Sequence, residues 1–550
     1  MARELARAMA KALSAAGVTT MFGVPGGGPN LEMIGAAQEF GIDFVLAHGE
    51  TAACVMASTH GRLTGGVGIA IVTRGPGLTS AINGLAQATL DRSPLVLISD
   101  TVPAAQSDRT AHQRLDQVAT AAPVTKWSGV LGHHDPAATV AAAIELAKAA
   151  PQGAVHLAFD PTQAGDMPPA PPRADASEAS ELRRARDLIC AARRPVIIIG
   201  LDAMPAARTI RAAVADAGVP VLVTYEAKGI IPESSTNYGG FFTGVKAEMP
   251  LLAAADLVIG IGLDSVEPMP GPWPHTAEVV LLHSHPVETA YFGSPTRLVG
   301  DYEHLLAEVF PLPDHTWPDG YARPDLAGAL DGLPSSSGLR PQDLVSITRE
   351  HFQAALVTVD AGAHMLVAMP LWQVEDPGSV LISNGLATMG FSLPAAIGAA
   401  TAFPKRKVIC FVGDGGLGMS LAELEVLNRR QLDVTVIVFN DASLSLIKLK
   451  QGDQQGGEAA VGYSPISFAG IATAMGIESA SARDAAELHM PSLDQPESRS
   501  SSTPASTPRT TSRSWDSREA DKPVTLLASP SLNSRNGSSR WIGGSCSMRS

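Results

Sequence analysis

Short apolar runs alternate with longer amphipathic segments along most of the chain. The runs are rich in Val and Ile and lack a polar residue at every second position, so we expect strands that are buried on both faces. Buried strands separated by helices are typical of parallel α/β sheets. The clearest of the predicted strands are residues 68–73, 95–100, 154–160, 195–200, 219–225, 255–262, 407–413 and 433–440.

Two proline-rich breaks, at residues 166–178 and 331–342, divide the chain into blocks of similar length. Clusters of proline and glycine mark loops between structural units, and each block has the size of one domain. We therefore predict an α/β fold with three doubly wound parallel-sheet domains, at residues 1–165, 178–330 and 340–490.

The tail of the chain, residues 491–550, loses the α/β rhythm and is rich in Ser, Thr, Pro and Arg. Seventeen of these 60 residues are serine, which leaves too little apolar surface for a packed core, so we expect disorder. Only PVTLLA, at 523–528, resembles a further strand.

Composition and charge exclude several classes of protein. The formal net charge of −14 disfavours nucleic-acid binding, which would need a basic surface. Four scattered cysteines without C-x-x-C spacing predict neither a disulfide framework nor a zinc site, and the cytoplasm is the simplest location. The first 17 residues resemble an amphipathic helix rather than a signal peptide, because Arg3, Arg7 and Lys11 interrupt the apolar positions. No apolar run reaches the roughly 18 residues of a membrane span, so no membrane partner is expected.

The segment CFVGDGGLGMSLAELE, residues 410–425, follows a predicted strand and opens a predicted helix. Its glycines, the last of them Gly418, spell the G-x-G-x-x-G fingerprint of dinucleotide-binding turns and favour a nicotinamide-dependent dehydrogenase. Asp414 would repel a diphosphate on that turn, however, unless a divalent cation bridged the two. Asp441 follows the next strand at the same sheet edge and is a second candidate ligand. The alternative is that Asp414 caps the helix and Asp441 only opens a turn.

The N-terminal block contains a second group of candidates. FGVPGGGPN, residues 22–30, is a strand-to-turn crossing, and residues 75–77 form another glycine turn before a helix. Between them, Glu50 stands at the predicted start of a helix in a largely apolar segment. A glutamate in that position is usually only a favourable charge at a helix N-terminus, so its candidacy depends on the two flanking turns.

Two further segments complete a resemblance to a known family: NGLATMGFSLPAAIGAA at 384–400 and DAGAHM at 360–365. Together with the turns at 413–415 and 440–441, they resemble thiamine-diphosphate enzymes of the acetolactate synthase group, over nearly all of the chain before the serine-rich tail. The resemblance implies an N-terminal pyrimidine-binding domain, a central domain and a C-terminal diphosphate-binding domain.

The resemblance also implies which residues hold thiamine diphosphate and Mg²⁺. The metal ligands would be Asp414, Asp441 and the backbone carbonyl of Ser443, with Asp441 standing where the family usually has Asn. Ala363 stands where the family often has Gln, so one diphosphate contact would be missing. The implied cofactor-binding residues are Pro25, Gly26, Glu50, Gly362, Ala363, His364, Ala387, Met389, Asp414, Gly415, Gly416 and Asp441.

The implied reaction is decarboxylation of a 2-keto acid with carboligation, as in branched-chain amino-acid biosynthesis, by a homodimer or homotetramer. Glu50 matches the family glutamate that hydrogen-bonds the cofactor pyrimidine, and Gln113 matches an active-site glutamine. A carboxyl group in a water-poor site has a raised pKa, which suits a group that holds a proton. His112 replaces a family Phe, and a loop histidine of this kind is more often structural.

The substrate and the role of the central domain stay open. Lys126 matches a family lysine but is equally well a solvated surface residue, and Lys448 or Lys450 could meet an anionic substrate. The resemblance allows FAD in the central domain, although this chain lacks the arginine that usually follows the strand at 255–262. Rival functions are a 2-keto acid decarboxylase or 2-hydroxyacyl lyase without ligation, and an inactive or regulatory paralogue, which the aberrant tail favours.

Overall fold

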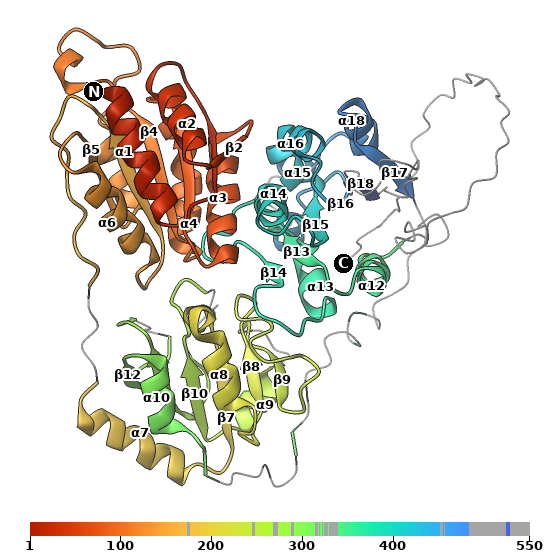
Figure 1. Ribbon diagram of the computed structural model, residues 1–550. Helices are drawn as coiled ribbons and strands as arrows, with labels where there is room; N and C mark the ends of the chain where they lie inside the picture. The colour runs from red at the N-terminus through yellow and green to blue at the C-terminus, as the bar shows by residue number, and fades with distance from the viewer. Residues whose placement is uncertain are drawn as a thin grey trace, which may run out of the picture.

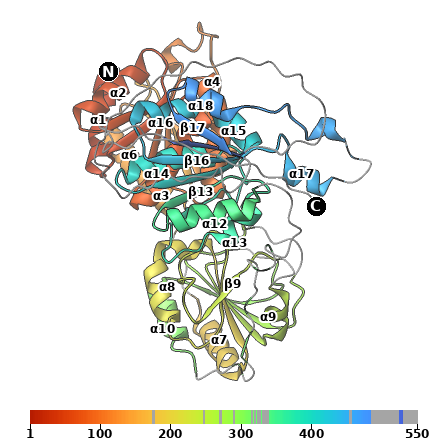
Figure 2. The ribbon, with the colours of Figure 1, turned by 90° about the vertical axis from the view of Figure 1, so that its right-hand side faces the viewer.

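The structure of the chain, a computed structural model, comprises three α/β domains, each built on a six-stranded sheet (Figure 1). The N-terminal and C-terminal domains lie above the central domain in both views (Figures 1 and 2). The structure describes residues 1–172, 177–244, 248–267, 273–287, 291–313, 317, 320–321, 323, 328, 330, 339–451, 455, 457–482 and the backbone of 524–528.

The N-terminal domain contains a wholly parallel sheet in the order β2-β1-β3-β4-β6-β5. Its central strands are buried on both faces, as their apolar sequences predict. The strands are β1 (Thr20–Val24), β2 (Asp43–Leu46), β3 (Gly68–Val72), β4 (Leu95–Asp100), β5 (Trp127–Leu131) and β6 (Ala154–Phe159). The α-helices are α1 (Ala2–Ala15), α2 (Pro29–Glu39), α3 (Glu50–Thr64), α4 (Pro76–Leu90), α5 (Gln117–Ala121) and α6 (Pro136–Lys148).

The central domain also has a parallel sheet, in the order β12-β11-β10-β7-β8-β9. The first strand, β7, lies in the middle of the sheet. β8 and β9 follow on one side of it, and β10, β11 and β12 follow on the other. The strands are β7 (Pro195–Ile199), β8 (Val221–Val223), β9 (Tyr238–Phe241), β10 (Leu257–Ile261), β11 (Glu278–His283) and β12 (Thr296–Val299). The described α-helices include α7 (Ala179–Ala191), α8 (Ala207–Val214), α9 (Met249–Ala254) and α10 (Tyr302–Val309).

The C-terminal domain has the sheet order β14-β13-β15-β16-β18-β17. The strands are β13 (Leu356–Val359), β14 (Val380–Leu381), β15 (Val408–Gly413), β16 (Val434–Phe439), β17 (Glu478–Ala482) and β18 (Val524–Ala528). The described α-helices are α12 (Pro341–His351), α13 (Met365–Leu371), α14 (Ser392–Ala402), α15 (Asp414–Ser420), α16 (Leu424–Arg430), α17 (Ser445–Lys450) and α18 (Phe468–Ala474).

One strand departs from the predicted parallel arrangement. β18 runs antiparallel to both of its neighbours, β16 and β17, so the third sheet is mixed. Mixed sheets are common in doubly wound folds, and here the antiparallel strand lies between β16 and the edge strand β17. β18 is the strand that PVTLLA indicates, so the expectation of disorder over the whole of 491–550 is wrong at 524–528. The rest of that prediction lies outside the described residues.

All eight strands predicted from apolar runs are confirmed. The helix starts at Glu50 and after Gly75 are confirmed too, as is the N-terminal helix. Among the described residues, no helix is both long and apolar enough to cross a bilayer.

The N-terminal and C-terminal domains share one apolar core and meet where α3 packs against α14. A glycine permits the close approach, since a Cβ added at Gly398 would lie 2.4 Å from the backbone oxygen of Met56. Two part-buried ion pairs join the central domain to the N-terminal domain: Arg62 with Glu226 at 2.9 Å, and Arg92 with Asp264 at 2.7 Å. These contacts link both of the other domains to the N-terminal domain.

Candidate functional site

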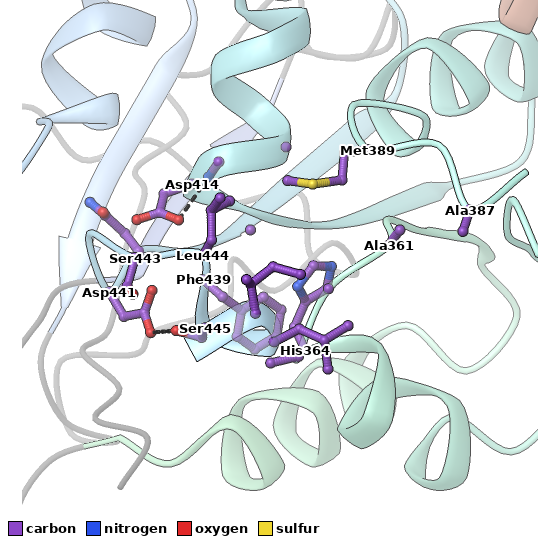
Figure 3. A pocket seen from close by; sticks show the side chains of 18 residues that line it. Ala361, His364, Ala387, Met389, Asp414, Phe439, Asp441, Ser443, Leu444 and Ser445 are labelled. Atoms are coloured by element: carbon purple, nitrogen blue, oxygen red, sulfur yellow. Dashed lines mark hydrogen bonds between the residues drawn. The ribbon is translucent and has the colours of Figure 1, made fainter. Parts of the chain in front are cut away.

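A cavity of about 260 Å³ lies at the carboxyl edge of the C-terminal sheet (Figure 3). Ligands of open α/β sheets bind at this edge, where the chain leaves each strand through a loop. Four segments, which follow β13, β14, β15 and β16, contribute to its wall. The lining residues are 361–364, 387, 389, 413–416, 439–441 and 443–447.

Two carboxylates stand at one side of the cavity (Figure 3). Asp414 is the first residue of α15, directly after β15, and Asp441 follows β16. Burial and then the negative charge of Asp441 raise the pKa of Asp414 to about 6. Asp441 is hydrogen-bonded to the hydroxyl of Ser445. A bound cation would offset the repulsion between the two carboxylates, and oxygen ligands suit a hard cation such as Mg²⁺.

Ser443, the third predicted metal ligand, lies on the same wall of the cavity. Its Oγ is buried and has no hydrogen-bond partner within the described part of the chain. No group of three or more His, Cys, Asp or Glu side chains suited to a metal occurs among the residues described. A cation beside Asp414 and Asp441 would therefore need further oxygen ligands from the backbone or from the bound ligand.

The glycine turn after β15 packs tightly against Asp360. A Cβ added at Gly416 would lie 1.8 Å from Asp360 Oδ2, so a side chain there would clash. Asp360 is buried and accepts hydrogen bonds from the N–H groups of Gly390 and Phe391, at 2.9 and 3.0 Å. This carboxylate joins two walls of the cavity. Sequence analysis missed it, although its place directly after a strand, like that of Asp414, was a usable signal.

His364 lines the cavity from the segment after β13 (Figure 3). Its ring stacks on Phe439, with 5.3 Å between the centroids, and its Nε2 has no hydrogen-bond partner among the described residues. Burial lowers the pKa of His364 to about 4, so the imidazole is neutral at physiological pH. A neutral ring can donate one hydrogen bond to an anionic ligand. The predicted neighbours Gly362 and Ala363 line the same wall.

Apolar side chains form the rest of the wall. A Cβ added at Gly415 would lie 2.9 Å from Leu444 Cδ2 and 3.5 Å from Met389 Cε, so the two side chains converge over the glycine turn. Ala387, on the loop before Met389, has a φ of +55°. Backbone strain of this kind in a residue other than glycine gathers at functional sites. Four residues predicted to bind the cofactor, Ala387, Met389, Gly415 and Gly416, all line this cavity.

The carboxyl edge of the N-terminal sheet brings together the other candidates. Pro25 and Gly26 follow β1, and a Cβ added at Gly26 would lie 2.2 Å from Thr73 Oγ1, just after β3. Gln113 lies on an exposed loop after β4, has a φ of +56° and contacts Gly75. The turns after these three strands therefore meet at one sheet edge.

Glu50 begins α3, directly after the loop from β2. The side chain is partly buried, and this burial raises the pKa of its carboxyl group. Neither Glu50 nor Pro25, Gly26 or Gln113 is among the described residues that line the cavity. The structure thus gathers the metal and diphosphate candidates in one place and the pyrimidine candidates in another.

The loop before Glu50 is held by a residue that sequence analysis missed. Glu423 belongs to a short 3₁₀ turn after α15 and accepts hydrogen bonds from the backbone N–H groups of His48 and Gly49. These contacts join segments from the first and last domains. A contact between residues so far apart in the chain leaves no signal in the local sequence pattern. From the sequence alone, Glu423 cannot be told from any other polar residue of a helix.

Two of the three lysine candidates have partners elsewhere. Lys126 donates to two backbone carbonyl oxygens near the end of α6, at 2.6 Å each, and thus acts as a helix cap. Lys448 pairs with Glu458 at 3.0 Å, and neither Lys448 nor Lys450 is among the cavity-lining residues that the structure describes. His112 is exposed on the same loop as Gln113.

The last glycine of the fingerprint, Gly418, does not serve as it would in a dinucleotide turn. There the third glycine permits close packing of helix on strand. Here no described atom lies within 4 Å of a Cβ added at Gly418. The acidic residues, the unpartnered His364 Nε2 and the tight glycine turn suit a diphosphate bridged by a cation better than a bare dinucleotide.

The chain matches three family models in the order of its domains. Residues 3–120 match the N-terminal TPP binding domain of thiamine pyrophosphate enzymes, 182–309 match their central domain, and 360–494 match their C-terminal TPP binding domain. Thiamine pyrophosphate (TPP) is another name for thiamine diphosphate.

Several curated proteins are similar to the chain over most of its length. The large subunit of acetolactate synthase isozyme 1 from Escherichia coli is 28% identical over 84% of this chain and 86% of its own. The acetolactate synthase large subunit from Lactococcus lactis is 28% identical, over 78% and 80%. The catabolic acetolactate synthase from Raoultella terrigena is 29% identical, over 84% and 88%. With all three family models matched in order, the chain belongs to the thiamine pyrophosphate enzymes, in the group that includes the acetolactate synthases.

Proposed function

We propose that this chain is a Mg²⁺- and thiamine-diphosphate-dependent enzyme that decarboxylates a 2-keto acid and joins the product to a second carbonyl compound, as an acetolactate synthase does. The observation that carries the proposal is the pair Asp414 and Asp441, which face one cavity from neighbouring strand ends beside a tight glycine turn. The similarity to acetolactate synthases supports the same reaction class. We place the reaction in the cytoplasm.

Each residue of the cavity has a role in this proposal. Asp414, Asp441 and the carbonyl of Ser443 would hold Mg²⁺, and the neutral His364 would donate a hydrogen bond to the diphosphate. Met389 and Leu444 would exclude water from the reacting centre. Thiamine diphosphate, when bound, supplies an electron sink that allows a 2-keto acid to lose carbon dioxide.

Glu50 would hold the proton at the pyrimidine ring, because its raised pKa favours a protonated carboxyl group. Since Glu50 and Gln113 do not line the described cavity of their own chain, a second copy of the chain would supply them. The proposal therefore includes a homodimer as the smallest active unit, with a homotetramer as a larger form.

The rival functions differ in what they predict. A nicotinamide-dependent dehydrogenase would bind NADH without metal, and the unpacked Gly418 argues against it. A simple decarboxylase or 2-hydroxyacyl lyase would share the cofactor and differ in product. An inactive or regulatory paralogue would bind the cofactor and turn over nothing.

We expect the purified chain to consume pyruvate and release acetolactate only when thiamine diphosphate and Mg²⁺ are both present. The measurement is product analysis of four parallel reactions, with both cofactors, each alone and neither. Free acetaldehyde in place of acetolactate would indicate the decarboxylase. Absence of turnover with every 2-keto acid tested, despite cofactor binding, would indicate the inactive paralogue.

A further inference from the structure

Glu423 connects the metal-binding turn to the loop that carries Glu50. It ends the 3₁₀ turn Leu421–Glu423, which follows α15, the helix that Asp414 begins. The residue is buried, at 2% exposed. Oε1 accepts from the N–H groups of His48 at 3.0 Å and Gly49 at 2.9 Å, and Oε2 accepts from His48 at 3.2 Å.

These two amides are the last before Glu50. Gly49 is the N-cap residue of α3 and has no side chain that could cap the helix. Glu423 instead supplies the anionic group that a helix N-terminus favours. The hydrogen bonds of this carboxylate come from the backbone of the loop and not from the side chain of Glu50. The position of the Glu50 carboxyl group therefore depends on where Glu423 holds the two preceding residues.

We propose that Glu423 is a positioning residue for Glu50, a role that rests on the function proposed above. A catalytic group must be held to within a fraction of an ångström, since a displacement of about 1 Å can cost roughly 100-fold in rate. Glu423 is not among the described residues that line the cavity, so it acts only through the loop. It also ties the Asp414 turn and the Glu50 turn of one chain to each other.

The test is Glu423→Gln, which keeps the size of the side chain but replaces one acceptor oxygen with an NH₂ group that cannot accept from an amide. We expect exchange of the C2 hydrogen of bound thiamine diphosphate, measured by quench and NMR in D₂O, to slow by about 10- to 100-fold. The affinity for Mg²⁺ and thiamine diphosphate should stay within a few-fold of wild type. A role limited to stability would change the unfolding temperature and leave the exchange rate of the folded protein unaltered.

Glu425→Gln is the matched control. Glu425 lies two residues further on and contacts the side chains of His48, at 2.9 Å, and Arg429, without contacting the two amides. Its variant should exchange at the wild-type rate. Glu423→Asp is the second variant: it keeps the charge but is too short to reach both amides, so an intermediate rate is expected. Wild-type exchange in both folded Glu423 variants would overturn the proposal. If wild type itself gave no acceleration over free cofactor, the proposed function would fail instead.

A second inference concerns the central domain, where the family resemblance allows FAD. The order in which strands are added to its parallel sheet reverses between β7 and β10, and a dinucleotide would bind in the crevice at the carboxyl ends of these two strands. In this chain the residues that follow β7 and β10 lie close together. A Cβ added at Gly200, just after β7, would lie 2.6 Å from the backbone oxygen of Gly262 and 2.7 Å from Glu267 Oε2.

In the described part of this crevice, three backbone donors are taken up by side-chain carboxyl groups of the chain itself. Glu267 Oε2 accepts from the N–H groups of Leu201 at 3.1 Å and Asp264 at 3.2 Å. Asp202 Oδ2 likewise accepts from the N–H of Ser284 at 3.0 Å. Amides in these positions are the groups that bind the pyrophosphate of a dinucleotide. They are already hydrogen-bonded here, and to acidic residues.

We infer that the central domain binds no flavin, because Glu267 and Asp202 take the place of the dinucleotide phosphates. The full chain, purified after addition of FAD and passed through gel filtration, should release no flavin fluorescence on denaturation. Equilibrium dialysis against micromolar FAD should show no saturable binding. Flavin retained in a ratio near one per chain, or saturable binding in dialysis, would overturn this inference and leave the proposal for Glu423 untouched.

Discussion

Replacement of Asp414 with alanine is expected to abolish Mg²⁺-dependent binding of thiamine diphosphate. The side chain is buried beside a second carboxylate, and the raised pKa of Asp414 reflects burial and that neighbouring charge. A cation bound beside the two carboxylates and a diphosphate would offset the repulsion between these negative charges. Loss of an outer-shell partner of a metal costs about 10- to 100-fold in affinity, so loss of a ligand should cost at least about 100-fold.

Isothermal titration of thiamine diphosphate with and without Mg²⁺ measures this effect. Asp414→Asn separates charge from shape, because it keeps one oxygen ligand and should retain weak binding. Asp433→Asn is the control: Asp433 precedes the opposite end of β16 and pairs with Lys407 at 2.7 Å. Its variant should bind as wild type does. Unchanged cofactor affinity in Asp414→Ala would show that the metal site has been assigned to the wrong residue.

Replacement of Glu50 with glutamine is expected to have the second large effect, on turnover rather than on binding. Positioned proton-holding groups contribute about 10²- to 10⁴-fold to enzymatic rates, and an amide cannot exchange a proton with the pyrimidine ring. Partial burial already raises the pKa of Glu50 in the isolated chain. Closer packing in a dimer would raise it further, since desolvation disfavours the charged form.

Steady-state turnover of pyruvate and the C2 exchange rate are the measurements for Glu50→Gln. Both should fall by at least about 100-fold, while cofactor affinity stays within a few-fold of wild type. Glu39→Gln is the control, because Glu39 lies on the surface of the same domain and pairs with Arg7. A Glu50→Gln variant with wild-type turnover would remove Glu50 from the mechanism.

The sequence alone was sufficient to predict the strands at the centre of each sheet. Runs such as 195–200 and 433–440 are apolar throughout, because both faces of these strands are covered. Edge strands such as β2 (Asp43–Leu46) were missed, since they are short and part-exposed and resemble loops. The orientation of β18 was not predictable either, because local pattern does not state which way a strand runs in its sheet.

The same distinction applies to the residues of the site: some could be predicted from local sequence pattern and others could not. Asp414 and Asp441 could be predicted because each directly follows a long apolar strand. Asp360 could have been found by the same rule, but its strand has only four residues. Glu423 could not, because its partners are the amides of His48 and Gly49 in another domain. Long-range hydrogen bonds to backbone groups place no demand on neighbouring residues and so leave no trace in a sequence pattern.

The position of β18 has a consequence for the order in which the C-terminal domain is completed during synthesis. β17 pairs only with β18 among the described strands, and β18 separates it from β16. Val436 and Leu527 are neighbours in the sheet but lie about 90 residues apart in the chain, a late and entropically costly pairing. Until residues 524–528 leave the ribosome, the outer edge of β16 has no strand to cover it. The nascent chain therefore exposes the hydrogen-bonding edge of a strand that ends at the cavity, which is a surface prone to aggregation and suited to chaperone binding.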